Sequence, residues 1–199
     1  MRVLFLSVGI VVADQITKLL VRGIRLPALG IHWEGMPLGA SRPLLGDFLR
    51  LTYVENPGMA FGIEVGGKIF FSVFSVLASI GIIYYLYRVR TERLGFRISL
   101  ALILGGAVGN LIDRVFYGPF FQGAPLFHGR VVDFLDVEFF DVTLFGSHLT
   151  RWPVFNIADA TVTVGVLLLL IFYRAPAEDL RPAPQPTPSE TPSSPGDNH

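Results

Sequence analysis

Hydrophobic residues gather in four long stretches, which cover residues 3–21, 69–87, 98–116 and 152–173. A bilayer core about 30 Å thick is crossed by a helix of roughly 20 mostly apolar residues. The pattern therefore predicts an all-α membrane protein with four transmembrane helices. The first stretch carries Asp14 and Lys18 inside a continuing helical pattern, so we interpret it as a retained span and not as a cleaved signal peptide.

The arginines predict how these spans are oriented. Excess positive charge in short loops marks the cytoplasmic side of a membrane protein. Arginines stand before the first span, in the short connection between the second and third, and after the fourth. They are Arg2, Arg88, Arg90, Arg93, Arg97 and Arg174. We therefore expect both termini inside and the long connections 22–68 and 117–151 outside.

The long connections predict a small extracytoplasmic β element at the membrane surface. Residues 47–55 alternate apolar and polar side chains, as a half-buried strand does. Residues 129–145 are rich in β-branched and aromatic side chains, which indicates one or two further strands. The Pro- and Ser-rich residues 175–199 lack the apolar side chains of a core, so we expect a disordered cytoplasmic tail after a four-span domain of residues 1–174.

Composition narrows the chemistry. Hydrophobic residues make up 51% of the chain, its formal net charge is zero and it has no cysteine. A nucleic-acid partner, disulfides and cysteine nucleophiles are therefore not expected. The four histidines lack metal-ligand spacing, and neither HExxH nor GxSxG occurs, so we expect no metal and no cofactor. Carboxylates remain as the abundant catalytic groups.

Polar residues in three of the predicted spans fall at one depth. With a rise of about 1.5 Å per residue, they lie roughly 17–26 Å from the cytoplasmic ends of their helices. They are Asp14, Lys18, Asn110, Asp113, Asn156 and Asp159. Simple structural explanations are a salt bridge between Asp14 and Lys18 and a helix-end ion pair between Asp113 and Arg114. The alternative is a site, because ionisable groups inside a membrane are usually functional. Two carboxylates that share a proton can hydrolyse an amide.

Five segments occur in the order typical of one family. Together they resemble bacterial lipoprotein signal peptidase (signal peptidase II) over residues 5–173. The segments are Asp14–Lys18 (DQITK), Asn56–Gly62 (NPGMAFG), Gly105–Arg114 (GGAVGNLIDR), Val131–Phe134 (VVDF) and Phe155–Asp159 (FNIAD).

The resemblance implies an intramembrane aspartyl endopeptidase in the bacterial cytoplasmic membrane, with its active site toward the extracytoplasmic face. It would cut prolipoproteins just before a diacylglyceryl-modified cysteine, among membrane lipids and as a monomer. The family's catalytic aspartates match Asp133 and Asp159, although helix depth alone favours Asp113 over Asp133. Its supporting residues match seven positions, to which we add Lys18 and Asp113. The seven are Asp14, Asn56, Gly58, Asn110, Arg114, Asn156 and Ala158.

Two other classes of protein place polar residues in membrane helices. One is a small proton-coupled transporter, which needs buried carboxylates but more often shows inverted repeats. The other is an assembly protein whose polar side chains join helices. The segment around Asn56 favours peptide hydrolysis: Pro57 makes Asn56 extended, Gly58 can take a positive φ, and the edge of the preceding strand could bind a peptide.

Overall fold

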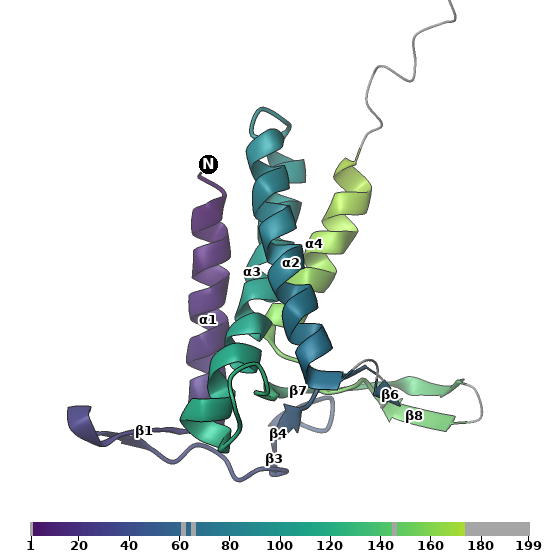
Figure 1. The fold of residues 1–199 in the computed structure, drawn as a ribbon. Coiled ribbons are helices and arrows are strands. Elements are labelled where there is room, and N and C mark those ends of the chain that lie inside the picture. The colour runs from purple at the N-terminus through teal and green to yellow at the C-terminus, as the bar shows by residue number, and fades with distance from the viewer. Residues whose placement is uncertain (1, 61–62, 65–66, 145–146, 174–199) are drawn as a thin grey trace, which may run out of the picture.

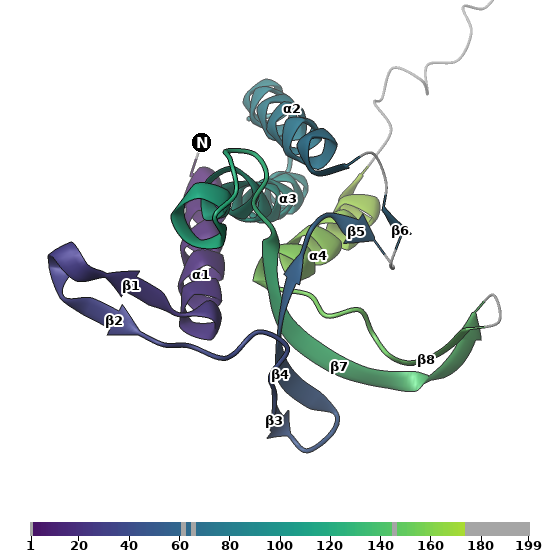
Figure 2. The same cartoon turned by 60° about the horizontal axis from the view of Figure 1, so that its bottom comes forward.

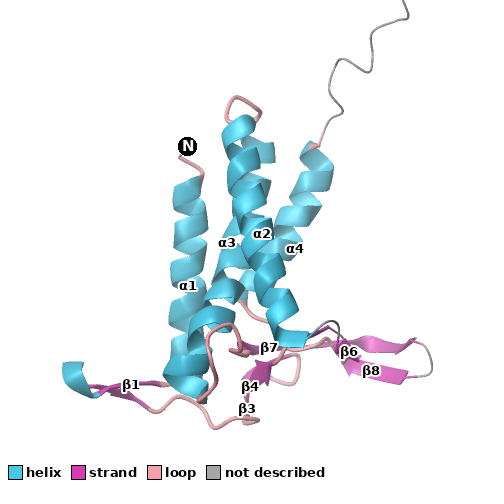
Figure 3. Ribbon diagram, in the orientation of Figure 1, coloured by secondary structure: helices cyan, strands magenta, loops and turns pink. Residues whose placement is uncertain are grey.

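The computed structural model describes residues 2–60, 63–64, 67–144 and 147–173. The expected tail of residues 175–199 lies outside this part of the chain. Helices stand side by side, and the strands gather at one end of them (Figures 1 and 3). The helices are α1 (Leu4–Arg22), α2 (Gly67–Arg88), α3 (Leu94–Ile112), which continues as a π-helix over Asp113–Gln122, and α4 (Ile157–Phe172). Because α3 packs against α1, α2 and α4, it is the centre of the bundle (Figure 2).

Among the described residues, three helical segments are long and apolar enough to cross a membrane: Leu4–Arg22, Ile69–Arg88 and Leu94–Gln122. The apolar helix α4 is shorter, with 16 residues. It begins at Ile157, later than the predicted start at 152, because residues before it have other partners. Asn156 caps the helix, and the backbone of Phe155 pairs with Leu135 of a neighbouring strand.

A four-stranded antiparallel sheet lies at the end of the bundle, in the order β3-β4-β7-β8. Two smaller sheets pair β1 with β2 and β5 with β6. The strands are β1 (Ile24–Leu26), β2 (Ile31–Trp33), β3 (Ser41–Leu45), β4 (Leu49–Asn56), β5 (Met59–Ala60), β6 (Ile63–Glu64), β7 (Val131–Leu144) and β8 (Ser147–Arg151).

The strand predicted over 47–55 is confirmed as β4, and the β-rich segment 129–145 forms the single long strand β7. The expectation of an open edge along the first of these strands is wrong. β4 lies inside the sheet with β3 on one side and β7 on the other. Tyr53 also exchanges backbone hydrogen bonds with Ala40 and Gly39, which occupies that edge beyond the end of β3.

The sheet is fixed to the helices by a buried apolar cluster. Its residues come from the end of α1, from the connection between β2 and β3, from β4, from the π-helix and from β7, and they bury their side chains against one another. The cluster consists of Val21, Met36, Tyr53, Tyr117, Val132 and Phe134. Burial of such side chains contributes about 1.5–3 kcal/mol each. β7 is thereby held directly beneath the helix ends.

Small residues let three helices meet closely. A Cβ on Gly109 of α3 would lie 2.7 Å from Oδ2 of Asp14 in α1 and 3.2 Å from Cβ of Ala158 in α4. A Cβ on Gly106 would collide with the carbonyl oxygen of Ala158. The glycines of α3 therefore let α1 and α4 pack closely against it.

Candidate active site

Asp159 is held at the amino-terminal end of α4 by a reciprocal capping box. The side-chain oxygen of Asn156 accepts a hydrogen bond from the backbone N–H of Asp159 at 3.0 Å. Oδ2 of Asp159 accepts one from the backbone N–H of Asn156 at 3.1 Å. Each side chain thus satisfies a donor that the first helical turn leaves unpaired. The carboxylate is fixed in the positive field of the helix end.

Asp133 comes from β7 and reaches the same place. Its side chain is buried, and Nδ2 of Asn156 donates to its Oδ1 at 2.7 Å. Backbone pairing explains this approach, because Phe134 and Leu135 both donate to the carbonyl of Phe155. The residues before α4 therefore run alongside β7. Asn156 joins the two carboxylates by contacting both.

Asn110 of α3 contacts both Asp159 and Asn156 from within the helix bundle. Its Nδ2 donates to Oδ1 of Asp159 at 2.8 Å. Its Oδ1 accepts from Nζ of Lys18 at 2.9 Å and from Nδ2 of Asn156 at 3.1 Å. Because an ammonium group only donates hydrogen bonds, Lys18 fixes which way the Asn110 amide points.

Lys18 belongs to a fully buried charge cluster that consists of Asp14, Lys18 and Asp113. Its ammonium contacts Oδ2 of Asp14 at 2.8 Å and Oδ2 of Asp113 at 2.9 Å. The predicted salt bridge between Asp14 and Lys18 is confirmed. The ion pair expected between Asp113 and Arg114 is wrong, because Asp113 points into the bundle and pairs with Lys18 of another helix.

The same cluster connects the helices to β7 and to the start of α4. These two elements carry Asp133 and Asp159, which we call the dyad. Oδ1 of Asp14 accepts from the backbone N–H of Ala158 in α4 at 3.0 Å. Oδ2 of Asp113 accepts from the backbone N–H of Val132 in β7 at 3.0 Å. Each buried carboxylate therefore holds the backbone next to one of the candidate catalytic aspartates.

Gln15 is a member of this network that our sequence analysis missed. Its Nε2 donates to Oδ1 of Asp113 at 2.9 Å, and its Oε1 accepts from the hydroxyl of Tyr117 at 3.1 Å. A signal was present, because a glutamine between Asp14 and Lys18 in an apolar helix needs buried partners.

Asn56 and Gly58 approach the dyad from the end of β4. A side-chain hydrogen bond joins Asn56 to Asp133, and Oδ1 of Asn56 also accepts from the backbone N–H of Gly58 at 2.9 Å. Gly58 has a φ of 109°, which confirms the predicted positive value. A Cβ there would lie 2.9 Å from the ring of Phe71. The positive φ and this close contact therefore both favour glycine at position 58.

Arg114, at the start of the π-helix, lies close enough to Asp133 and Asp159 to interact with both through its charge. Its charge acts on Asp159, Asp113 and Asp133. Its guanidinium carbon lies 5.5 Å from the centre of the Phe71 ring, in a cation–π contact. The ring of Phe71 and the nearby carboxylates therefore both favour a positive charge at this position.

Burial, and after it the neighbouring charge of Asp159, raise the pKa of Asp133 from 3.8 to about 7. Hydrogen bonds from Asn56 and Asn156 act in the opposite direction. Asp133 can therefore keep its proton up to about neutral pH, and a carboxyl group that keeps its proton can serve as the acid in acid–base hydrolysis.

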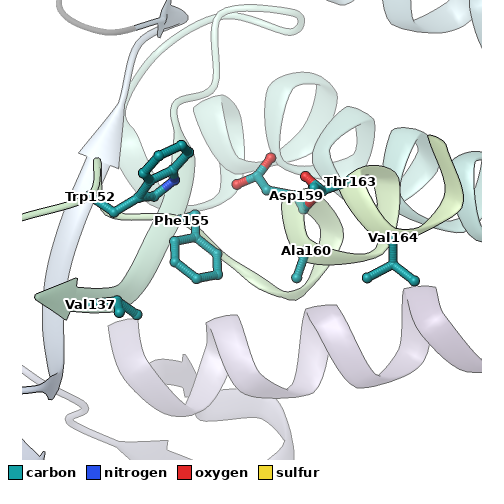
Figure 4. A pocket seen from close by; sticks show the side chains of 7 residues that line it. All are labelled: Val137, Trp152, Phe155, Asp159, Ala160, Thr163 and Val164. Carbon is teal, nitrogen blue, oxygen red and sulfur yellow. Dashed lines mark hydrogen bonds between the residues drawn. The ribbon is translucent and has the colours of Figure 1, made fainter. Parts of the chain in front are cut away.

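A cavity of about 430 Å³ opens beside Asp159 (Figure 4). One wall is the face of α4 and the other is formed by β7 and the residues before α4. The lining side chains are Val137, Trp152, Phe155, Asp159, Ala160, Thr163 and Val164. The walls are mostly apolar, so the cavity suits an apolar chain or side chain next to the carboxylate.

Other polar residues are placed apart from this site. Asp136, also on β7, accepts from Nε of Arg151 at 2.6 Å and from the hydroxyl of Thr52 at 2.6 Å. Asp136 lies on the opposite face of the strand from Asp133 and joins β7 to β4 and β8, so it stabilises the sheet. Within the described ranges, no group of three or more His, Cys, Asp or Glu side chains could hold a metal ion.

Comparison with known proteins gives consistent matches over most of the chain. The profile of the family described as signal peptidase (SPase) II matches residues 6–174. The lipoprotein signal peptidase of Chlorobium phaeobacteroides (strain BS1) is 37% identical over 174 residues, which cover 87% of this chain and 96% of that protein. The lipoprotein signal peptidase of Porphyromonas gingivalis (strain ATCC 33277) is 36% identical, covering 84% of this chain and 80% of that protein.

Solved structures give the same result for the fold. A structure described as a bacterial membrane enzyme, solved by the in meso method at 2.3 Å resolution, has a TM-score of 0.63 and 29% identity to this chain. The similarity covers 85% of both chains. A second structure with the same description, at 1.9 Å resolution, has a TM-score of 0.59. The helical bundle with its small sheets is therefore a known membrane-enzyme architecture.

Proposed function

The chain belongs to the signal peptidase II family, and we propose that Asp133 and Asp159 are the paired aspartates with which it removes the signal peptides of bacterial lipoprotein precursors. The observation that carries the assignment of the dyad is Asn156, which contacts both carboxyl groups next to an apolar cavity. The match to a protease family leaves the alternative of a small transporter without support.

The chemistry follows from the environments of the two carboxyl groups. Both oxygens of Asp159 accept hydrogen bonds, as an ionised carboxylate does, so it acts as the base that takes a proton from water. The water oxygen bonds to the scissile carbonyl carbon, while Asp133 gives its proton to the carbonyl oxygen. The proton gained by Asp159 then passes to the leaving nitrogen as the C–N bond breaks. The hydroxyl of the intermediate returns its proton to Asp133 as the new carboxyl group forms.

The supporting residues act on this pair in three ways. Asn110 and Asn156 orient the carboxyl groups, and Asn56 and Gly58 position the peptide. Arg114 stabilises the negative charge that develops on the carbonyl oxygen. The remaining proposed residues hold the backbone around the dyad. They are Asp14, Lys18, Asp113 and Ala158.

We further propose that all four helices cross the membrane, with both termini in the cytoplasm and the sheet outside. Three observations support this. Arg88 ends α2, and Arg90 and Arg93 follow it, at the end of the bundle away from the sheet. The beginning of α1 and the end of α4 lie at that same end (Figure 1). Finally, α4 is about 24 Å long, which brings its capped end just below the outer surface of the bilayer core.

In this proposed arrangement, the dyad would lie where a diacylglyceryl-modified cysteine would sit. The lipid chains of the substrate would lie among bilayer lipids along the exposed apolar face of α4, which includes Val164 and Leu167. The residues before the cysteine would lie over the sheet, and the enzyme would act as a monomer in the bacterial inner membrane. We assign the peptidase domain to residues 1–174, in agreement with the end of the family match.

The decisive experiment is cleavage of a diacylglyceryl-modified lipobox peptide by the purified protein in detergent. Asp133→Asn and Asp159→Asn should each lower the rate by at least about 10³-fold, because each removes an acid–base group from a site that acts as a unit. Asp136→Asn is the matched control, since Asp136 lies on the same strand but pairs with Arg151.

The unmodified peptide serves as a second control and should be cut poorly. Substantial activity in either dyad variant, measured on folded protein, would overturn the assignment of these two residues. Inhibition by a chelator would overturn the metal-free chemistry.

A further inference from the structure

The hairpin formed by β1 and β2, with the short 3₁₀ helix Pro27–Leu29 at its tip, extends sideways from the end of α1 (Figures 1 and 2). It forms a separate two-stranded sheet. Isolated two-stranded hairpins are at best marginally stable in water and need an apolar surface to pack on. This hairpin therefore needs a covering partner.

The pairing register gives the hairpin one apolar face and one polar face. Ile24 pairs with Trp33, Arg25 with His32, and Leu26 with Ile31. Paired residues, and residues two apart on a strand, share a face of the sheet. One face therefore carries four apolar side chains: Ile24, Leu26, Ile31 and Trp33. The opposite face carries Arg25 and His32 at its centre.

The apolar face is directed back along α1. The indole Nε1 of Trp33 donates to the carbonyl oxygen of Leu20, in the last turn of α1, at 2.8 Å. The base of the hairpin is fixed as well, because the backbone N–H of Met36 donates to the carbonyl of Val21 at 2.7 Å. The other residues of the apolar face point the same way as Trp33, toward the level of the membrane helices.

The apolar face is exposed and continues an exposed stripe on α1. Trp33 is 55% exposed, and Leu29 at the tip is 71% exposed. Apolar side chains also face outward along the length of α1 at intervals of three or four residues. They are Phe5, Val8, Val12, Ile16 and Leu20. In a membrane enzyme this stripe faces the acyl chains, so the surface that meets the hairpin at Leu20 is lipid.

We propose that the β1–β2 hairpin is a membrane-surface anchor, with its apolar face in the interface of the phospholipid bilayer and with Arg25 and His32 toward water. Tryptophan is enriched at this depth because its ring is apolar and its N–H is polar. Arginine on the water-facing side suits the phosphate level. The anchor lies outside the catalytic dyad and binds lipid surface, not substrate.

The absence of cysteine from the chain allows a direct test with single spin labels. Labels are attached to Leu26→Cys and Ile31→Cys on the apolar face, and to Arg25→Cys and His32→Cys on the polar face. The full-length protein is placed in phosphatidylcholine–phosphatidylglycerol vesicles. Collision rates are measured with oxygen, which concentrates in the bilayer, and with a water-soluble nickel chelate.

The proposal expects the ratio of oxygen to nickel collisions to be several-fold higher at positions 26 and 31 than at 25 and 32. Equal ratios on both faces, or the reverse order, would overturn it. Shielding of positions 26 and 31 from both reagents, with dipolar coupling between chains, would overturn it in favour of a second copy.

A label on Ile16→Cys, in the exposed stripe of α1, tests whether the helices lie in the membrane. This test is independent of whether the hairpin is an anchor. High oxygen collision at position 16 together with equal ratios on the hairpin faces would overturn the anchor alone. High nickel collision at position 16 would overturn both the anchor and the proposed spans.

Discussion

Asp133 holds the proton that the proposed reaction needs, because burial and the charge of Asp159 raise its pKa to about 7. Above this pH the residue loses its proton, and the acid that protonates the substrate carbonyl is missing. We therefore expect kcat/KM for the modified peptide to fall about tenfold per pH unit on the alkaline side of neutrality. The measurement is a pH–rate profile from pH 6 to 9 with a peptide that carries no group titrating in this range. A flat profile would show that Asp133 does not supply the proton.

Lys18 makes a separate contribution, because all three of its N–H donors are used inside the bundle. They contact Asp14, Asp113 and Asn110. Lys18→Met would leave two buried carboxylates without their cation, which costs about 3–5 kcal/mol in the free energy of unfolding. It would also release the amide of Asn110 that orients Asp159. We expect a clearly lower unfolding temperature in detergent, and lower activity in the protein that remains folded.

The matched control for this change is Arg25→Met, which removes an exposed positive charge from the hairpin. Surface substitutions of this kind usually change stability by no more than about 0.5 kcal/mol. An unfolding temperature of Lys18→Met equal to that of Arg25→Met would mean that the buried cluster contributes nothing to the fold.

At the scale of elements, the turn after β4 depends on a glycine. Gly58 has a positive φ, and a methyl group there would press on Phe71. Gly58→Ala should therefore shift the turn and displace Asn56 from Asp133, with a marked loss of peptide cleavage while the helices stay assembled. The measurement pairs cleavage kinetics with circular dichroism of the purified variant.

Gly39→Ala is the matched control for the glycine substitution. Gly39 also has a positive φ, of 80°, but a Cβ there meets open space. It should cost stability of order 1 kcal/mol from backbone strain, with cleavage unchanged. Equal cleavage by the two variants would show that the turn at Gly58 does not position substrate.

Elements that form through interactions between residues close in the sequence could be predicted. Elements that depend on residues far apart in the sequence could not. The helices follow from long apolar stretches, and β4 follows from its alternation, because both signals are local. The β1–β2 hairpin was missed because three-residue strands carry too little alternation to recognise. The start of α4 was misplaced because it depends on pairing between Phe155 and a strand about twenty residues earlier, and hydropathy contains no information on such pairing.

At the scale of the whole molecule, the same limit applies to the site. Helix depth brought Asp14, Asn110, Asn156 and Asp159 into one layer correctly, since each position follows from counting residues along a helix. It favoured Asp113 over Asp133 because a residue on a strand has no such depth rule. Only the resemblance to a family selected Asp133. In the structure Asp113 binds Lys18 and the backbone of Val132, whereas Asp133 is joined to Asp159 through Asn156.

Burial of Asp133 beside Asp159 also lowers the stability of the whole fold once this carboxyl group is ionised. In the unfolded chain its pKa is about 3.8, whereas in the folded protein burial raises it to about 7. The folded state therefore binds this proton more tightly, so stability is greatest below pH 4 for this group and is lost as the pH rises to about 7. Each unit of this pKa difference corresponds to about 1.4 kcal/mol in the free energy of unfolding.

Asp133→Asn removes this ionisation while keeping the shape of the side chain and an oxygen for Asn156. We expect the variant to be inactive but to unfold at a higher temperature than the unchanged protein at pH 8, with a smaller difference at pH 5. The measurement is the apparent unfolding temperature in detergent at the two pH values, with Asp136→Asn as the control that should keep the original pH dependence. A variant that unfolds at a lower temperature at both pH values, by the same amount, would mean that the charge on Asp133 does not strain the fold.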